Sequence, residues 1–415
     1  MATSLRWRAL RLRFRIPPLD WPLAWAAVGL IVMGLLTVYS ATSIPGVHEG
    51  LWLKQLMWAV VALVAAYLAA AAPYRMYDSL AYPVYGVSLV FLVLVLVMGS
   101  SAFGAKRWLD LGPLKFQPSE LAKIATVLVL ARRMDDPKLD LRRARYWLPP
   151  MLFTLVPLLL VAKEPDLGTS LAFPIILIAM YFWAGMPVPQ LMLGLSPALN
   201  VAFFVFTGSV WWFAGILVAL IAWFRPRLPA LVAIVVLNGA VAIAMPHIWN
   251  GLHDYQKRRI ETFLNPGQDP YGAGYQIIQS KIAIGSGGVT GKGYLKGTQK
   301  ALAFLPMRHT DFIYSVVGEE LGLIGAVIVV ILYTLLILRG YTLAYMARSG
   351  FASLMVVGLV TALFYHIMVN MLMTIGWAPV TGLPLPLLSY GGTALIVNGI
   401  QIGLLQNVAI RRHEF

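Results

Sequence analysis

Long apolar stretches follow one another along this chain and leave little sequence between them. Twelve stretches are candidates to cross the ~30 Å hydrocarbon core of a membrane as helices, although one is short (118–131) and the region 188–224 is difficult to divide. They lie at residues 21–40, 52–72, 80–98, 118–131, 147–162, 167–184, 188–206, 209–224, 229–245, 311–338, 350–375 and 386–409. Because irregular backbone cannot face lipid, each is expected to be a helix. Only 12% of the residues are charged, against about 25% in soluble domains, so the sequence predicts an all-α polytopic membrane protein.

Basic residues in the short loops predict the orientation. The net charge is +15, and Lys and Arg are enriched in the cytoplasmic loops of membrane proteins. The arginines before the first stretch place the N-terminus in the cytoplasm, and alternation from there places the other short basic loops on the same side. These arginines are Arg6, Arg8, Arg11, Arg13, Arg15, Arg132, Arg133, Arg142, Arg143, Arg145, Arg225, Arg227, Arg339, Arg348, Arg411 and Arg412. Both termini are therefore predicted to be cytoplasmic.

Two loops on the predicted outer side are also basic. The loop 99–117 holds Lys106, Arg107 and Lys115, and the segment 246–310 holds eight Lys or Arg residues. Long loops are partly exempt from the charge rule, so these loops do not contradict the orientation. Basic side chains beside the outer leaflet suit an anionic ligand, and phosphate groups on a lipid carrier are the candidate.

The run from Gly285 to Gly293 is rich in glycine and contains Lys292. A nucleotide-binding loop needs Gly six positions before that lysine and Ser or Thr after it, whereas this chain has Ser286 and Gly293 there. A nucleotide site is therefore excluded. Two interpretations remain open: the glycines serve turn geometry, or the loop amides contact phosphate.

Ionisable residues stand at several predicted helix ends. Asp254 precedes Lys257 by three residues and Arg258 by four, which fits either a surface ion pair or a carboxylate base that nearby cations keep ionised. Glu120 and Lys123, three residues apart, share one face of a short span. They are either an end-capping arrangement or two charges within a membrane segment, which are expensive there unless they are paired or line a wet cavity.

Other polar residues are harder to interpret from sequence. Lys163, Glu164 and Asp166 repeat the pattern of paired charges at another outer helix end. Glu319 and Glu320 lie inside a predicted span and need partners or water; a buried polar cluster that joins helices is one interpretation. His247, His253 and His309 show no tight metal-ligand spacing, and the absence of cysteine excludes disulfides, cysteine-based metal sites and a thiol nucleophile.

Several short motifs occur together in an order typical of one known family. They are Lys106-Arg-Trp-Leu, Phe116-Gln-Pro-Ser-Glu-Leu-Ala-Lys123, Glu164-Pro-Asp-Leu-Gly-Thr-Ser170, His253-Asp-Tyr-Gln, Gly272-Ala-Gly-Tyr-Gln276, Gln279-Ser-Lys-Ile-Ala-Ile-Gly-Ser-Gly-Gly288, His309-Thr-Asp-Phe312 and Gly382-Leu-Pro-Leu-Pro-Leu-Leu-Ser-Tyr-Gly-Gly392. From about residue 20 to 412 the chain resembles the SEDS (shape, elongation, division and sporulation) family. Its uninterrupted Asp-Tyr-Gln segment is more similar to the RodA branch than to the FtsW branch. Met307 stands where the family often has an acidic residue, so no function is assigned to that position.

The resemblance implies a fold of ten transmembrane helices, to which this chain adds a helical hairpin near 207–245. The expected parts are a basic cytoplasmic N-terminus (1–19), a first transmembrane bundle (20–245), a large extracytoplasmic catalytic loop (246–310), a second transmembrane bundle (311–410) and a cytoplasmic tail (411–415). The implied activity is that of a peptidoglycan glycosyltransferase at the outer face of the bacterial cytoplasmic membrane. It would polymerise lipid II, a disaccharide-pentapeptide on undecaprenyl pyrophosphate, during cell elongation. The implied partners are a class B penicillin-binding protein, which is a transpeptidase, and the elongation machinery; no nucleic acid is expected.

The mechanism that the resemblance implies needs one base, because the pyrophosphate can leave once cations neutralise it. Asp254 is assigned as the base for the acceptor hydroxyl, and displacement at the donor sugar would invert its configuration. Arg107, Lys123 and either Arg258 or Lys292 would hold the phosphates, while Glu120 would orient Lys123. No cofactor is expected, apart from an optional divalent cation such as Mg²⁺ or Mn²⁺, for which no dedicated ligand set is visible. The alternative is a lipid II flippase, but a transporter should carry charge deep in its spans or reachable from both sides, and here the charge is concentrated on the outer side.

Overall fold

The structure is a computed structural model that describes residues 19–43, 50–102, 105–112, 114–136, 140–141, 146–209, 211–226, 228–251, 254–265, 274–298 and 307–411. Its helices are α1 (Trp21–Thr42), α2 (Leu51–Ala71), α3 (Tyr74–Met98), α4 (Pro118–Met134), α5 (Leu148–Lys163), α6 (Leu167–Ser170), α7 (Ala172–Trp183), α8 (Val188–Thr207), α9 (Trp211–Phe224), α10 (Leu228–Gly251), α11 (Asp254–Leu264), α12 (Tyr275–Gly287), α14 (Ile313–Met346), α15 (Gly350–Thr374) and α16 (Gly392–Arg411). Each predicted apolar stretch overlaps a described helix. Eight of the described helices are long and apolar enough to cross a membrane. The prediction of a helical polytopic membrane protein is confirmed, while the number of crossings stays a prediction.

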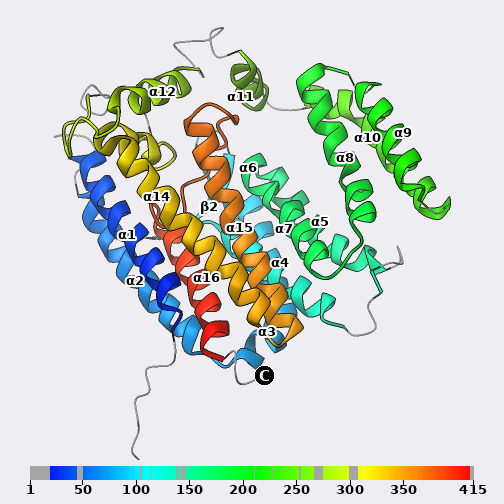
Figure 1. Cartoon of the computed structure of the whole chain (residues 1–415), viewed down its shortest axis with the longest axis horizontal. Coiled ribbons are helices and arrows are strands. Elements are labelled where there is room, and N and C mark those ends of the chain that lie inside the picture. Colours follow the sequence, from blue (N-terminus) through cyan, green and yellow to red (C-terminus); the bar gives the residue numbers. More distant parts are fainter. Residues whose placement is uncertain are drawn as a thin grey trace, which may run out of the picture.

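Helices α15 and α16 form the centre of the main bundle, since 78% of the apolar window of each is buried inside the protein. Helix α15 packs against α14, α7 and α4, and α16 packs against α2 (Figure 1). Small residues allow this close approach: a Cβ at Gly358 of α15 would lie 2.6 Å from Val127 of α4, and one at Gly403 of α16 would lie 2.3 Å from the carbonyl oxygen of Ala66 on α2. Such small-residue contacts are typical of helix packing in membranes.

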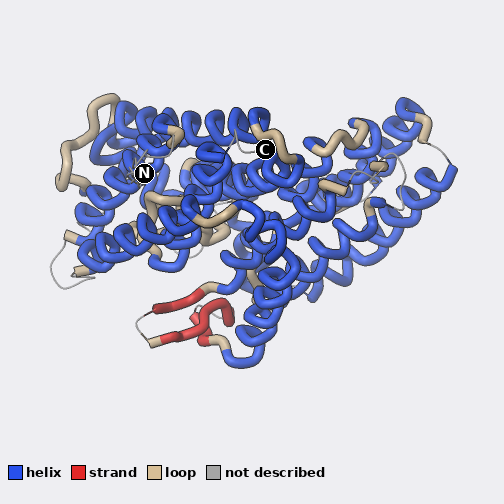
Figure 2. Tube along the Cα trace, turned by 90° about the horizontal axis from the view of Figure 1, so that it is seen from below, coloured by secondary structure: helices blue, strands red, loops and turns tan. Residues whose placement is uncertain are grey.

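The segment between α3 and α4, predicted to be an outer loop, contains a small antiparallel sheet. Its strands are β1 (Ser100–Ala102), β2 (Ala105–Leu111) and β3 (Leu114–Phe116), in that spatial order. The turn after β2 contains Gly112 at φ +71, a left-handed conformation that favours glycine. Figure 2 shows the strands beyond the helices at one end of the molecule. These strands were not predicted from the sequence, because β1 and β3 have only three residues each, too few to show alternation. Arg107 lies on β2, which pairs with both of them.

Helices α8, α9 and α10 occupy the region of the predicted extra hairpin. Helix α8 packs on both α9 and α10, and α7 connects it to the rest of the chain (Figure 1). Helix α10 continues through Pro246 to Gly251, so it extends into the segment 246–310 that was predicted to be a loop; that segment also contains α11 and α12. Helix α9 has 14 residues and is therefore about 21 Å long, shorter than the ~30 Å of hydrocarbon. Helices α9 and α10 lie where the extra hairpin was predicted, but each packs on α8, so the extra hairpin and a complete crossing by α9 both stay predictions.

Basic residues from loops predicted to be cytoplasmic meet at one end of the main bundle, which we call the basic end. Arg339, in the last turns of α14, donates from Nε to Oδ1 of Asp20 at the start of α1 (3.2 Å). Arg411, at the end of α16, donates to the last carbonyls of α2. Arg132, at the end of α4, lies 3.8 Å from the carboxylate of Asp78 at the start of α3. The starts of α4, α14 and α16 consequently lie at the opposite end of the bundle.

Helix α14 is interrupted at Gly322, and the glycine-rich loop after α12 fills the interruption. Gly322 has φ +63 and non-helical backbone. The carbonyls of Glu319 and Glu320 accept from the amides of Lys292 and Gly293 (both 3.0 Å). In the same way, the two amides after Gly322 donate to the carbonyls at 288 and 289 (2.9 and 3.2 Å). The loop thus replaces hydrogen bonds that an unbroken helix would make, and the amides at 292 and 293 are used for this purpose. Turn geometry and close packing therefore account for these glycines without a phosphate.

Replacing Gly322 with Ala should destabilise the protein by more than about 1 kcal/mol, because a side chain is disfavoured at positive φ. A Cβ at this position would also lie 2.3 Å from the amide nitrogen of Gly291. Thermal unfolding of the purified protein in detergent measures the effect. Gly215→Ala is the matched control: Gly215 lies inside α9 with no atom near its added Cβ, and Ala is the better helix former by about 0.5–1 kcal/mol. Equal melting temperatures for Gly322→Ala and the unchanged protein would show that the interruption is not required.

Candidate functional site

Three of the motifs singled out in the sequence meet at the end of the bundle opposite the basic end. The hydroxyl of Ser389 donates to the carbonyl of Thr310 (2.6 Å), and the amide of Tyr390 donates to the carbonyl of His309 (2.9 Å). The side chain of Asn370, on α15, donates to the carbonyl of Asp311 (2.9 Å). The 164–170 segment joins this group through Gly168, since the hydroxyl of Tyr365 on α15 donates to its carbonyl (2.7 Å). Segments far apart in sequence thereby form one surface around the last turns of α15.

Arg107, Glu164, Asp166 and Asp311 form a charged group at this end, which we call the Arg107 cluster. The guanidinium of Arg107 donates to the carbonyl of Pro165, and its Nη1 lies 3.8 Å from Oδ1 of Asp166. Asp166 caps α6 and is itself buried: its carboxylate accepts from the amide and hydroxyl of Thr169 (3.2 and 2.9 Å). It also accepts a long hydrogen bond from Gln117, just before α4 (3.4 Å). Asp166 thus positions Arg107 loosely, at more than hydrogen-bond distance.

Asp311 lies in the turn before α14. Burial raises the pKa of its carboxyl to about 6, although the charges of Arg259 and Arg107 and a hydrogen bond from Thr310 lower it. Asp166 raises the pKa further through its negative charge. The charges of Arg107 and of Arg259 on α11 therefore both act on the carboxyl of Asp311, whose pKa stays above that of an ordinary aspartate because of burial. The sequence analysis did not assign a role to Asp311, although it lies in the motif His309-Thr-Asp-Phe312.

Glu164, in the two-residue connection between α5 and Asp166, is the most deeply buried carboxyl of the Arg107 cluster. It has no exposed surface, and neither of its carboxylate oxygens has a hydrogen-bond partner in the described structure. Burial raises the pKa of its carboxyl to about 9, with a further increase from the charge of Asp166 and a decrease from Arg107. The group is therefore protonated at neutral pH.

Glu120, Lys123 and His366 form a second charged group, which we call the Lys123 triad. Nζ of Lys123 lies 2.8 Å from Oε1 of Glu120 and 2.6 Å from Nε2 of His366 on α15. Lys123 is 2% exposed and Glu120 is 4% exposed. The two residues are therefore a buried ion pair, which was one of the arrangements expected from their spacing. His366 was missed by the sequence analysis, although a single histidine inside an apolar span is a signal of a polar partner.

The Lys123 triad lies about one helical turn closer to the basic end of the bundle than the Arg107 cluster. Gln117 contacts the Arg107 cluster through Asp166, and Glu120 is the third residue after it, a rise of about 4.5 Å along α4. On α15, Asn370 holds the backbone of Asp311, and His366 is four residues earlier, on the same face of that helix. Helices α4 and α15 therefore connect the two groups.

Lys292 belongs to a different set of contacts. Its Nζ lies 2.8 Å from Oε1 of Glu319 and 2.7 Å from the hydroxyl of Thr298. The neighbouring Glu320 accepts from the hydroxyl of Ser40 on α1 (2.6 and 2.7 Å to its two oxygens). Glu319 and Glu320 thus form a buried polar cluster that joins α1, α14 and the loop after α12. Lys292 is paired within that cluster, and a phosphate contact by Lys292 stays a prediction.

The proposed base and its neighbouring cation lie on α11. Asp254 is the first residue of that helix, and its side chain lies outside the part of the chain that the structure describes. Arg258 is exposed one turn later. Figure 1 shows α11 beyond the end of α15, at the same end of the molecule as α12. Among the described residues, Arg259 rather than Arg258 is the α11 cation that acts on the Arg107 cluster.

Within the described residues, no group of three His, Asp or Glu side chains could hold a metal ion. The oxygens of Asp166 are already used by Thr169, Gln117 and Arg107. The part of the chain that the structure describes therefore shows no dedicated divalent-cation site, and assistance by an optional cation stays a prediction.

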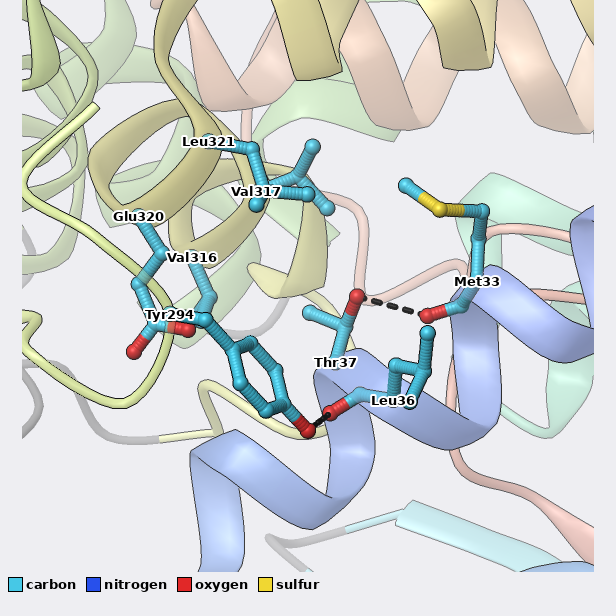
Figure 3. A pocket seen from close by; sticks show the side chains of 8 residues that line it. All are labelled: Met33, Leu36, Thr37, Tyr294, Val316, Val317, Glu320 and Leu321. Carbon is cyan, nitrogen blue, oxygen red and sulfur yellow. Dashed lines mark hydrogen bonds between the residues drawn. The ribbon is translucent and has the colours of Figure 1, made fainter. Parts of the chain in front are cut away.

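A small pocket lies between α1 and the first half of α14. It has a volume of about 290 Å³ and is lined by Met33, Leu36, Thr37, Tyr294, Val316, Val317, Glu320 and Leu321. Figure 3 shows that Tyr294 closes one side of it, where its hydroxyl donates to the carbonyl of Leu36 (2.9 Å). The pocket is lined by elements other than those of the Arg107 cluster, and its wall is mostly apolar.

Comparison with known proteins gives consistent matches over nearly the whole chain. The model of the FtsW, RodA and SpoVE family, described as cell cycle protein, matches residues 21–414. The peptidoglycan glycosyltransferase MrdB of Escherichia coli K12 is 39% identical over 404 residues, which cover 95% of this chain and 94% of MrdB. A chain from a solved peptidoglycan synthase complex, described as coordinating polymerization and crosslinking, aligns with a TM-score of 0.73 and 32% identity over 96% of this chain and 99% of that one. The rod shape determining protein RodA of Thermus thermophilus aligns with a TM-score of 0.63 and 29% identity over 95% of this chain and 98% of that one.

Proposed function

We propose a mechanism on the premise that this chain belongs to the FtsW, RodA and SpoVE family and is a peptidoglycan glycosyltransferase. Its substrate in this proposal is lipid II, used both as glycosyl donor and as acceptor. The observation that carries the proposal is the position of Arg107. It lies at the end of the bundle where the motif segments meet, is 18% exposed, and is held by a carboxylate at 3.8 Å, so an anion could compete for it.

The proposed chemistry is an inverting displacement. Asp254 removes the proton from the 4-hydroxyl of the acceptor's terminal N-acetylglucosamine while that oxygen attacks C1 of the donor N-acetylmuramic acid. The bond between C1 and the pyrophosphate oxygen breaks, and undecaprenyl pyrophosphate leaves with the bonding electrons. The α-linked phosphate is thereby converted into a β-1,4 bond, and the proton remains on Asp254 until it exchanges with solvent.

Cations stabilise the leaving pyrophosphate in this proposal, since its negative charge increases as the bond breaks. Arg107 is the first of these cations, because a planar guanidinium can bind phosphate through two donors. Arg258 is a second candidate: it is exposed and one turn from Asp254. Lys123 and Lys292 would contribute only after exchanging their present partners, Glu120 and Glu319. Glu120 would orient Lys123 in that state.

We also propose on which side of the membrane the reaction takes place and which protein is the partner. Basic residues gathered at one end of the bundle support a cytoplasmic location for that end and for both termini, which leaves the Arg107 cluster facing outward from the bacterial cytoplasmic membrane. The similar chain of known structure comes from a complex that couples polymerization to crosslinking. This supports a penicillin-binding protein of class B as partner, within the elongation machinery.

Purified protein given labelled lipid II in detergent should form glycan polymer. Detergent removes the sidedness of a bilayer, so a flippase would give no product there. Polymer on a denaturing gel is the measurement, and lipid II recovered unchanged by folded protein would contradict the proposed function.

Within that assay, Arg107→Ala should raise the KM for lipid II by about tenfold or more, because a charge-assisted hydrogen bond contributes about 1.5–3 kcal/mol. Arg107→Lys should restore only part of the affinity, since an ammonium lacks the planar fork. Lys115→Ala is the matched control: Lys115 is an exposed cation on β3 of the same sheet. An equal increase in KM for Lys115→Ala would mean that the sheet supplies only general positive charge.

A further inference from the structure

Glu164 has an arrangement that the proposed mechanism does not use. The side chain is completely buried, and both of its oxygens lack a hydrogen-bond partner within the described structure. An ionised carboxylate in such a place is strongly unfavourable. A protonated carboxyl is far easier to bury, and this agrees with the direction in which burial moves the pKa of Glu164.

The charged groups around Glu164 belong to the Arg107 cluster. Asp166, two residues along the chain, and Arg107, which donates to the carbonyl of the intervening Pro165, both act on its ionisation. Asp311, from the turn before α14, is within electrostatic range of both of these. Lys163 precedes it on α5 and is exposed, so solvent screens its charge.

The charge balance of this group depends on one proton. With Glu164 neutral, the positive charge of Arg107 faces the negative charge of Asp166, and Asp166 is also engaged by Thr169 and Gln117. With Glu164 ionised, a second negative charge acts on the guanidinium. That charge would repel an incoming phosphate and hold Arg107 back from it.

We propose that Glu164 is a positioning residue that stays protonated so that Arg107 remains available to the pyrophosphate, and that its ionisation at alkaline pH weakens substrate binding. The proposal rests on the phosphate role proposed for Arg107. The only chemical step is loss of the carboxyl proton of Glu164 to solvent, with no bond to substrate formed or broken. Because the pyrophosphate is already an anion in the bound substrate, the effect should appear in the KM, and any change in kcat would come from the charge that develops as the bond breaks.

The test is the KM for lipid II between about pH 7 and pH 9.5, a range that spans the ionisation of a carboxyl with so high a pKa. In the unchanged protein the KM should rise on the order of tenfold. Glu164→Gln, which keeps the neutral shape, should remove most of that rise. In the Arg107→Ala background the rise should be small whether residue 164 is Glu or Gln, because the guanidinium on which the charge acts is missing.

Infrared difference spectra give a second readout that does not depend on activity. The carbonyl stretch of a protonated carboxylic acid should be lost from the spectrum of folded Glu164→Gln at neutral pH. A rise in KM that persists in Glu164→Gln would overturn the proposal. So would a folded Glu164→Gln protein that loses lipid II affinity at neutral pH as strongly as Arg107→Ala, because Glu164 would then act as an anion. Absence of polymer from the unchanged protein would instead contradict the proposed function itself.

Discussion

Asp254→Asn should lower the rate of lipid II polymerisation by about 10²- to 10⁴-fold, the contribution typical of a general base. The amide keeps the size of the side chain but cannot accept the proton of the acceptor hydroxyl at neutral pH. Because Asp254 begins α11 and that helix lies beyond the end of the main bundle, the change should leave the fold intact. The measurement is the initial rate of polymer formation at saturating lipid II, with the melting temperature as the check on folding.

Glu261→Gln is the matched control for that experiment. Glu261 lies seven residues after Asp254, on the same face of α11, and is exposed. Its replacement removes one negative charge from the same helix but leaves the proposed base in place, so the rate should change by less than about twofold. A polymerisation rate in Asp254→Asn within a few-fold of the unchanged protein would remove Asp254 from the role of base. Asp311, the carboxyl whose pKa burial raises to about 6, would then be the next candidate.

Much of the helical fold could be predicted because a membrane allows few alternatives. Backbone that crosses lipid must satisfy its own hydrogen bonds, so apolar length alone locates helices. The ends were less predictable: α14 continues to Met346, past the predicted end at 338. Arg339, the first residue after that predicted end, still lies in the helix and pairs with Asp20. The sheet that carries Arg107 was not predicted, since its strands depend on pairing between short segments.

The candidate site was predictable only where its contacts are local. Glu120 and Lys123 are one helical turn apart, so their spacing already indicated the ion pair that is present at 2.8 Å. The third member of that triad, His366, comes from a helix more than 200 residues away, and no local pattern links it to Lys123. The same reason applies to Arg107, the 164–166 segment and Asp311, which lie far apart in sequence and come together only in the folded protein. Lys292 shows how a local pattern can leave a distant partner unseen. Its position in a glycine-rich loop suggested a contact to phosphate as one interpretation, and in the structure its carboxylate partner is Glu319.

The Lys123 triad should be the most sensitive part of the fold to loss of one charge. Glu120→Gln would leave the ammonium of Lys123 buried without its carboxylate, and breaking a buried ion pair in this way costs about 3–5 kcal/mol. The double variant Glu120→Gln with Lys123→Met removes both charges and should recover most of that stability, because the two groups no longer need each other. Thermal unfolding in detergent measures both variants.

Asp136→Asn is the control that separates the effect of burying an ion pair from the effect of losing one. Asp136 pairs with Arg133 at 3.3 Å with the same three-residue spacing, but both side chains are partly exposed, so the loss should stay below about 1 kcal/mol. If the Glu120→Gln and Asp136→Asn variants had the same melting temperature, the buried ion pair would contribute no more stability than a surface pair. Polymerisation by the double variant then separates structure from function. A stable double variant that makes polymer at the unchanged rate would restrict Glu120 and Lys123 to a structural role. A stable but inactive double variant would support the proposed contact between Lys123 and the pyrophosphate.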